Sequence, residues 1–553
     1  MTIVDPDLVE RAEAWLAEDP DPATAHELRD LLDRARQGDT AASAELADAF
    51  DGTLQFGTAG LRGRLGPGSN RMNRVVVARA AAGLAQYLCD TGGHAVVIGY
   101  DARRNSDVFA HDTAQIMAGA GISAMVLPHP LPTPLTAFAI RYLGASAGVM
   151  VTASHNPPDD NGYKVYVADG AQIIPPTDAA ISARIEAVGP LAGIPRSDDY
   201  VTLDNSIIDA YVNQVEELLL PGPRDIITVY TPMHGVGGDV FIRSAMEAGF
   251  PRPRPVAAQF APDGSFPTVR FPNPEEPGAM DLALAEAREH GADIIIANDP
   301  DADRCSAGIP TADGFRMLSG DETGWLLGWW TIERMRRRGL PMQGTLAQSI
   351  VSGTLLRDIA ASAGLDYAIT LTGFKWIARV PRLIFGYEQA LGYCVDPEHV
   401  KDKDGISASL VMMELAAHLK AEGRSIDDVL AGLAREHGLY LTSELSVRVT
   451  DLSLISDAMI RLRAHPPSTL AGRTVIECVD LEQGAFGLPP TDGLLFTLDN
   501  ARVIVRPSGT EPKIKCYLQV VIPDVHDIQA ARTAANEEMT ALRESLSQAL
   551  AMG

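Results

Sequence analysis

Short apolar runs alternate with longer amphipathic stretches over most of the chain, which is the pattern typical of α/β domains. Between residues 95 and 155 this pattern predicts strands at 95–101, 123–128 and 147–155, separated by helices at 106–121 and 133–145. Strands joined by helices of this length favour parallel pairing within one sheet. The segment therefore predicts a β-α-β-α-β unit.

Two later segments repeat the alternation of short apolar runs and helices. The first, after the Pro-Gly-Pro linker at 221–223, predicts strands within 225–238 and 292–299, and the second predicts a strand at 345–353 followed by a helix at 354–364. The repetition predicts a second and a third α/β unit of similar construction.

The pattern changes after about Gly438. Apolar runs of strand length then follow one another closely and a long helix ends the chain; the runs lie at 443–449, 474–481, 494–500, 501–507 and 515–522. This order predicts a smaller α+β domain. We therefore predict an α/β protein of four domains, at 1–204, 205–320, 321–438 and 439–553.

Length and composition narrow the class of protein. A chain of 553 residues exceeds what one core usually supports, and no run approaches the ~18 apolar residues of a membrane helix. The acidic N-terminus lacks the features of a secretion signal, and five scattered cysteines without a Cys-x-x-Cys pair argue against disulfides or a zinc site. We expect a soluble, cytoplasmic protein.

Net charge restricts the partners. The formal charge of −26 predicts repulsion of nucleic acid and of anionic membranes. We therefore expect neither as a partner, and an anionic substrate would need a local basic cluster.

The first candidate loop spans residues 57–73, GTAGLRGRLGPGSNRMN, and is rich in glycine and arginine. Glycine lets the backbone approach a ligand, and arginine offers paired donors to phosphate. A flexible surface loop is the alternative. The P-loop pattern of nucleoside triphosphate sites is absent.

The second loop follows the apolar run at 147–151 and reads VTASHNPPDDNGYKVY. Two consecutive prolines prevent the strand from continuing, so Ser154 is predicted on a loop at the strand end. The Gly-x-Ser-x-Gly pattern of a nucleophile elbow is absent, and alternation along an extended backbone predicts that Ser154 and His155 point apart. Lys164 reaches the same site if the chain reverses at Asn161-Gly162; otherwise Ser154 and Lys164 are solvated residues.

The third loop, DPDADR, follows the apolar run that ends at Ala297. Asp299, Asp301 and Asp303 can converge on a hard cation if the backbone bends, and would otherwise repel one another. An EF-hand would need glycine where Arg304 stands. The pattern also resembles the first motif of haloacid-dehalogenase-type phosphatases, with Asp299 as nucleophile. An acidic solvated turn is the remaining alternative.

The fourth loop, RPSGTEPK, spans residues 506–513. Its guanidinium, hydroxyl and ammonium groups, with a backbone N–H, form a candidate phosphate clamp. An ordinary Ser-Gly turn is the alternative.

Together these loops resemble the α-D-phosphohexomutase superfamily of phosphoglucomutases and phosphomannomutases. The resemblance rests on GTAGLRG, TASHNPPDDNGYKVY, DPDADR, the segment GYEQALGY at 386–393, and RPSGTEPKIK, which occur in the family's order. The segments TLTGFKWI and VKDKDGI resemble the branch with phosphopentomutase and glucose-1,6-bisphosphate synthase activities. The family's fold of four domains around a central cleft is implied.

The resemblance also implies an activity. It is the interconversion of sugar 1-phosphate and 6-phosphate, of glucose and/or mannose, through a phosphorylated Ser154 and a bisphosphorylated sugar. A sugar bisphosphate activator, Mg²⁺ bound by the phosphoserine with Asp299, Asp301 and Asp303, and a monomer or weak dimer are further implications. Phosphopentomutase activity is the alternative within the family; a phosphatase and a non-catalytic sugar-phosphate-binding protein are the alternatives outside it.

Roles for individual residues follow from the same resemblance. Arg62 and Arg304 would stabilise the transferring phosphoryl group, and Lys164 or His155 would handle the hydroxyl proton. Residues implied in substrate binding, besides Arg304, are Lys375, Glu388, Gln389, Arg506, Ser508, Gly509, Thr510 and Lys513. Relatives commonly have glutamate where Gln389 stands, which leaves hexose selectivity open.

Overall fold

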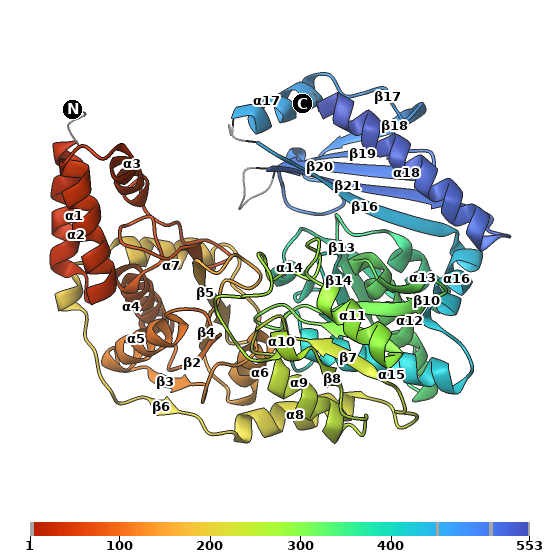
Figure 1. The fold of residues 1–553 in the computed structure, drawn as a ribbon, viewed down its shortest axis with the longest axis horizontal. Coiled ribbons are helices and arrows are strands. Elements are labelled where there is room, and N and C mark those ends of the chain that lie inside the picture. The colour runs from red at the N-terminus through yellow and green to blue at the C-terminus, as the bar shows by residue number, and fades with distance from the viewer. Residues whose placement is uncertain (1–4, 450–452, 508–512, 551–553) are drawn as a thin grey trace. The chain divides into compact units, whose positions relative to one another are not determined.

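The computed structural model of the chain describes residues 5–449, 453–507 and 513–550. The contacts divide the chain into two units, one of residues 1–317 and 392–417 and the other of residues 318–391 and 418–553. The first unit holds three N-terminal helices, two sheets with their helices, and the later segment 392–417, and the second holds the remaining helices and strands (Figure 1).

The first unit begins with three helices, α1 (Pro6–Glu18), α2 (Pro22–Arg36) and α3 (Thr40–Ala49). The side chains of Asp5, Asp21 and Asp39 precede them and accept hydrogen bonds from first-turn backbone N–H groups. Such caps satisfy donors that a helix start leaves unpaired. Buried side chains such as Leu28 and Leu46 give these helices a core of their own.

A six-stranded mixed sheet follows, in the order β1-β5-β4-β2-β3-β6. Strands β2, β3, β4 and β6 are parallel, whereas β5 pairs antiparallel with β1 and β4. Every residue of β2 and β4 is buried, which explains their continuous apolar sequences. The elements are β1 (Leu61–Arg64), α4 (Arg74–Thr91), β2 (Ala95–Tyr100), α5 (Ser106–Gly119), β3 (Ser123–Val126), α6 (Thr133–Tyr142), β4 (Ala147–Val151), β5 (Asp160–Val167), α7 (Thr177–Glu186), η1 (Leu191–Gly193) and β6 (Val201–Thr202).

The second sheet has the order β11-β10-β9-β7-β8 and places a buried strand, β9, directly before the acidic loop. Its elements are α8 (Ser206–Leu218), β7 (Thr228–Thr231), α9 (Gly238–Glu247), β8 (Arg254–Pro255), α10 (Ala257–Phe260), α11 (Asp281–His290), β9 (Ile294–Ala297), β10 (Ser306–Thr311) and β11 (Gly314–Met317). The chain returns to this unit with β15 (Gly392–Cys394) and most of α15 (Gly405–Ala421).

The second unit contains a parallel arrangement in which β12 pairs with both β13 and β14. Its first elements are α12 (Gly320–Arg337), β12 (Thr345–Ser349), α13 (Leu355–Ala363), β13 (Asp366–Thr370), α14 (Phe374–Ile377), β14 (Leu383–Glu388) and α16 (Ile426–His437). A capping box formed by Ser319 and Glu322 opens α12.

The unit ends in a sheet ordered β16-β21-β20-β19-β18-β17, whose paired strands are antiparallel. The helix α18 lies along this sheet (Figure 1), with Met539, Leu542 and Leu546 in a core shared with the strands. The elements are β16 (Leu439–Arg448), α17 (Ser453–Ala464), β17 (Thr469–Leu470), β18 (Arg473–Asp480), η2 (Leu481–Gln483), β19 (Leu494–Leu498), β20 (Ala501–Pro507), β21 (Lys513–Ile522) and α18 (Ile528–Leu550).

The predicted fold class, three α/β units followed by an α+β domain, is confirmed. The expected chain reversal at Asn161-Gly162 is wrong, because both residues lie inside β5 and the reversal occurs over 152–159. The four domain boundaries stay a prediction.

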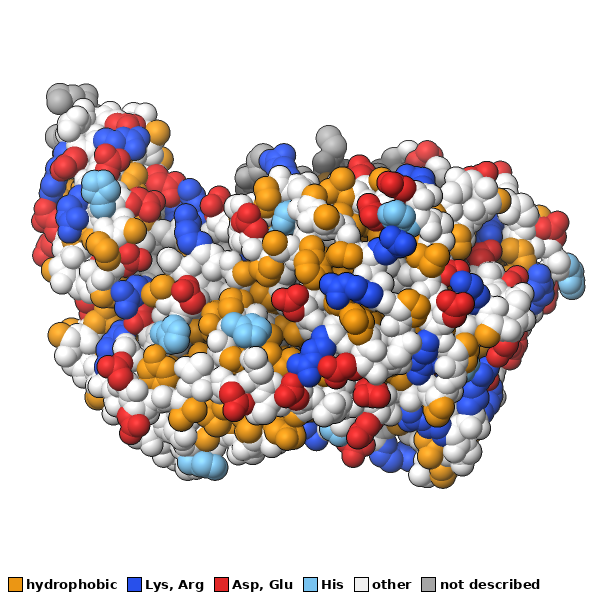
Figure 2. Space-filling model, turned by 60° about the horizontal axis from the view of Figure 1, so that its bottom comes forward, with side chains coloured by type: hydrophobic (Ala, Val, Ile, Leu, Met, Phe, Trp, Pro, Cys, Tyr) orange, Lys and Arg blue, Asp and Glu red, His pale blue; other side chains and the backbone are white. Residues whose placement is uncertain are grey.

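Among the described residues, no helix combines the length and the apolar character that crossing a bilayer requires. On the face drawn in Figure 2, acidic and basic side chains are interspersed, with hydrophobic side chains between them. Positive charge on this face is therefore local rather than continuous.

Candidate active site

Ser154 lies on the loop between β4 and β5, as the two prolines predict. Its φ of 52° places it in the left-handed region, which non-glycine residues seldom adopt. The residue is 2% exposed, and its Oγ donates to Asp299 Oδ2 at 2.9 Å. The loop therefore holds a buried hydroxyl against the first acidic residue.

The expectation that Ser154 and His155 point apart is wrong. Ser154 Oγ lies 3.2 Å from His155 Nδ1, because the backbone at Ser154 is left-handed instead of extended. Burial and the nearby Arg304 and Arg62 guanidinium groups hold the pKa of His155 well below its usual value. The imidazole is consequently neutral at physiological pH.

Lys164 reaches the same site from β5, which pairs with β4. Its Nζ donates to Asp301 Oδ2 at 2.7 Å and to Asp303 Oδ2 at 3.0 Å. Burial by itself would lower the pKa of Lys164, but the charges of the two carboxylates raise it above its ordinary value. The ammonium group is therefore charged in this arrangement.

The three aspartates converge as the spacing predicts. Asp299, Asp301 and Asp303 are fully buried, and their carboxylate oxygens lie within 4.8 Å of one another. The bend that this requires occurs at Ala302, whose φ is 54°. Burial and the charges of Asp301 and Asp303 raise the pKa of Asp299 well above its ordinary value.

The donor set of this cluster fits a divalent cation. Among the described residues, Asp301 Oδ1 and Asp303 Oδ1 are buried without a hydrogen-bond partner, although the other oxygen of each is bonded. Buried carboxylate oxygens lacking a partner are costly, and hard cations bind such oxygens. The three aspartates are therefore suited to hold Mg²⁺.

Arg62 and Arg304 lie beside this cluster. Arg304 Nε is 3.6 Å from Asp299 Oδ2 and 3.8 Å from Asp303 Oδ1. Arg62, on β1, donates to Asn156 Oδ1 at 3.3 Å within the serine loop. Two guanidinium groups thus flank the serine and the carboxylates.

Lys403 is a site residue that the residue-level reasoning did not identify. Its Nζ donates to Asp303 Oδ2 at 2.5 Å, and the backbone N of Gly405, two residues further on, donates to Ala302 O at 3.2 Å. Lys403 belongs to the motif VKDKDGI, which indicated only the resemblance to the branch with phosphopentomutase activity. Four basic residues, Arg62, Lys164, Arg304 and Lys403, therefore surround the buried carboxylates.

Arg103 was also missed, and it fixes the serine loop. This buried guanidinium donates to the backbone carbonyls of Ser154, Asn156, Pro157 and Asp160, at 2.5–3.1 Å. Burial lowers the pKa of Arg103, while the carboxylate of Asp101 opposes that shift. One side chain thereby satisfies four carbonyls of the loop.

Replacing Arg103 with methionine should lower both stability and turnover. The substitution leaves Asp101 buried without its ion-pair partner, at a cost of about 3–5 kcal/mol, and releases four carbonyls. Urea unfolding of R103M measures the first effect, and an assay of the sugar-phosphate interconversion that the family resemblance implies measures the second. An unchanged unfolding midpoint would contradict the role of Arg103 in holding the serine loop. Arg104→Met, a substitution at the neighbouring arginine, is the control.

A second group of predicted residues lies in the other unit. Glu388, the last residue of β14, accepts a hydrogen bond from Gly373 N at 2.7 Å, and Arg506 on β20 donates to Thr372 Oγ1. Lys375 lies in α14, which follows directly. The structure therefore brings the candidate sugar residue and one clamp residue to the same segment, 372–375.

Gln389 has a different setting from Glu388. Its Oε1 accepts from Ser352 Oγ at 3.2 Å and its backbone N donates to the same oxygen at 3.1 Å. The carbonyl end of this amide is thus held by the protein. Of the clamp, Lys513 begins β21, whereas Ser508, Gly509 and Thr510 lie outside the described residues.

Comparisons with known proteins cover most of the chain. Models of the phosphoglucomutase/phosphomannomutase family match in order: domain I at 53–190, domain II at 209–311, domain III at 319–437 and the C-terminal domain at 444–532. None of these matched regions includes α1–α3.

Individual relatives agree with these matches. A protein of Haemophilus influenzae named "Probable phosphomannomutase" is 49% identical, over 82% of this chain and 94% of its own. The human phosphopentomutase is 34% identical, over 97% of this chain and 95% of its own. A solved phosphoglucomutase/phosphomannomutase family structure from Burkholderia thailandensis has a TM-score of 0.69 at 20% identity, covering 90% of this chain and 98% of that one, and shows the same fold.

Proposed function

Because the chain belongs to the phosphoglucomutase/phosphomannomutase family, a family of phosphotransferase isomerases, we propose that it interconverts the 1- and 6-phosphates of glucose and mannose through a phosphorylated Ser154. The observation that carries the proposal is the hydrogen bond, 2.9 Å long, from Ser154 Oγ to Asp299, which is one of three buried aspartates whose carboxylates converge. A hydroxyl placed there is suited to carry a phosphoryl group whose charge a cation offsets.

The proposed reaction transfers that phosphoryl group to a sugar hydroxyl. The hydroxyl oxygen of the sugar phosphate forms a bond to phosphorus, and the bond from phosphorus to Ser154 Oγ breaks, so that Ser154 Oγ leaves with the electron pair and takes up a proton. The hydroxyl proton of the sugar passes to the neutral imidazole of His155, because Lys164 is already protonated. The bisphosphorylated sugar then turns over and returns its other phosphoryl group to Ser154. Arg62 and Arg304 stabilise the charge on the transferring oxygens.

Asp299, Asp301 and Asp303 would hold Mg²⁺ together with the phosphoserine. When bound, this cation withdraws charge from the transferring phosphoryl group. Lys164 and Lys403 balance the carboxylates and keep them in place, since both ammonium groups donate to Asp303. A sugar bisphosphate would serve as the activator that first phosphorylates Ser154.

Sugar recognition should depend more on phosphate than on sugar stereochemistry. Charge-assisted contacts to phosphate contribute ~1.5–3 kcal/mol each, whereas a hydroxyl bonded to a neutral amide contributes ~0.5–1.5 kcal/mol. Glu388 Oε1 and Gln389 Oε1 are already bonded within the protein, which limits the oxygens that remain for sugar hydroxyls. A pentose 1-phosphate is then a second candidate substrate, and the human phosphopentomutase relative favours it.

The expected result is turnover of glucose, mannose and ribose 1-phosphates with kcat/KM values within about a hundredfold of one another. A coupled mutase assay with a sugar bisphosphate activator measures these ratios. Lys513→Ala should lower all three values by a similar factor, with Lys515→Ala as the control two residues away. Discrimination of glucose from mannose by more than about ten-thousandfold would contradict recognition dominated by phosphate.

A further inference from the structure

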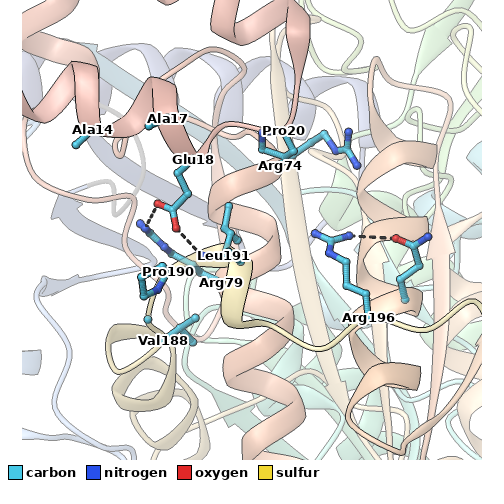
Figure 3. A pocket seen from close by; sticks show the side chains of 13 residues that line it. Ala14, Ala17, Glu18, Pro20, Arg74, Arg79, Val188, Pro190, Leu191 and Arg196 are labelled. Atoms are coloured by element: carbon cyan, nitrogen blue, oxygen red, sulfur yellow. Dashed lines mark hydrogen bonds and ion pairs between the residues drawn. The ribbon is translucent and has the colours of Figure 1, made fainter.

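A cavity of about 1000 Å³ lies beside the N-terminal helix α1 and outside the candidate active site (Figure 3). No hydrogen bond or ion pair among the described residues joins its lining to Ser154 or to the three aspartates. The family matches begin at residue 53, so the side of the cavity formed by α1 lies outside them. The charged residues in its lining are Glu18, Arg74, Arg79 and Arg196.

Two of the three arginines share a buried carboxylate. Arg74 donates to both oxygens of Asp112, at 2.7 and 2.8 Å, and Arg196 Nη1 donates to Asp112 Oδ1 at 2.7 Å and to Gln115 at 3.1 Å. Asp112 is 2% exposed, so both guanidinium groups are bonded to a buried carboxylate. Within the described part of the chain, Arg74 Nη1 and Arg196 Nη2 have no hydrogen-bond partner. These N–H groups are preorganised donors.

The third arginine, Arg79, is held by residues of α1. Arg79 Nη2 donates to Glu18 Oε2 at 2.7 Å, and its guanidinium lies 5.5 Å from the centre of the Trp15 ring. Glu18 also accepts from Leu191 N, so it lies between Arg79 and Leu191 (Figure 3). Arg79 Nε is buried without a partner among the described residues.

The lining of the cavity is more basic than the chain as a whole. The charged residues of the lining, Glu18 and three arginines, together with the buried Asp112 leave one positive charge, in a chain of net charge −26. Asp19 and Asp21 act on Arg74 from nearby but do not line the cavity. Their carboxylates accept hydrogen bonds from Asp21 N, Thr24 Oγ1 and Ala23 N. The lining therefore offers donors to an anion.

We propose that this cavity is a binding site for a small phosphomonoester, distinct from the mutase site. The phosphate accepts hydrogen bonds from Arg74 and Arg196, because its several oxygens can engage two guanidinium groups at once. The organic part lies against Ala14, Ala17 and Leu191, which supply an apolar surface. An occupant held in this way joins α1 to α4 and to the segment that carries Arg196.

Thermal unfolding in inorganic phosphate tests this site. Tm is measured for the full-length protein with chloride replaced by phosphate at constant ionic strength, in wild type, R196Q and R184Q. Arg184 is a matched control, because it also donates to an aspartate, Asp90, with a similar side-chain exposure of 30% against 32% for Arg196. Phosphate bound at the mutase site raises Tm equally in all three proteins and cancels in the comparison.

Wild type and R184Q should show the same phosphate-induced rise in Tm, and R196Q a rise smaller by at least half. Equal rises in all three proteins would overturn the proposal, even if R196Q has a lower Tm without phosphate. The same measurements in malonate, a dicarboxylate, show whether the site prefers phosphate or carboxylate. An Arg196-dependent rise in malonate but not in phosphate would overturn the assignment to a phosphomonoester.

Discussion

Ser154→Ala is expected to reduce mutase turnover by about 10⁴-fold or more. The substitution removes the only atom of that side chain that can carry the phosphoryl group, and loss of a covalent nucleophile has effects of this size. The fold should persist, since Ser154 Oγ makes a single hydrogen bond to a carboxylate besides its contact with His155. The measurement is kcat with glucose 1-phosphate and a sugar bisphosphate activator.

Ser146→Ala is the matched control for this prediction. Ser146 lies before β4 in the same domain, and its Oγ contacts His94 instead of the acidic cluster. Its replacement should leave turnover within about twofold of wild type. Release of inorganic phosphate that persists in S154A would instead indicate a phosphatase with Asp299 as nucleophile.

Removal of divalent cations should abolish turnover, and Mg²⁺ should restore it. Without a cation, three buried carboxylates and a phosphoserine lie together, and their mutual repulsion opposes the placement that transfer requires. Dialysis against EDTA followed by Mg²⁺ titration measures both effects. Full activity after exhaustive EDTA treatment would be incompatible with the proposed site.

Asp301→Asn tests the same site without a chelator. The amide keeps the shape of the side chain but loses its charge. Substitution of residues that only support a metal ligand weakens metal binding by roughly 10–100-fold, so the Mg²⁺ concentration for half-maximal activity should rise by at least that factor in D301N. Glu289→Gln makes the equivalent change in the surface cluster of Glu286, Glu289 and His290, and should have no effect. An identical Mg²⁺ dependence in D301N and wild type would contradict the assignment of Asp301 as a ligand.

The arrangement of elements in the first sheet could be predicted because its strands are buried on both sides. Strands β2 and β4 carry continuous apolar sequences for that reason, and the prolines at 157 and 158 mark where β4 cannot continue. The place of the next turn could not be predicted. Asn161-Gly162 is a strong local turn signal, but pairing of β5 with β1 and β4 outweighs it.

The acidic cluster was predictable from spacing, whereas its basic partners were not. Alternate aspartates after a buried strand leave few arrangements other than a shared cation. Lys403 and Arg103 are far from these residues in sequence, and only tertiary contacts show that Lys403 meets Asp303 and that Arg103 holds the serine loop. The contact of His155 with Ser154 likewise depends on one left-handed residue, which local alternation does not indicate.

Intact-protein mass spectrometry tests the phosphoserine proposal most directly. After incubation with a sugar bisphosphate and removal of excess ligand, wild type should be heavier by one phosphoryl group, which peptide mapping should place on Ser154, and addition of sugar monophosphate should remove it. S154A should show no gain in mass. Sustained mutase turnover by a protein that never carries phosphate on Ser154 would contradict the account.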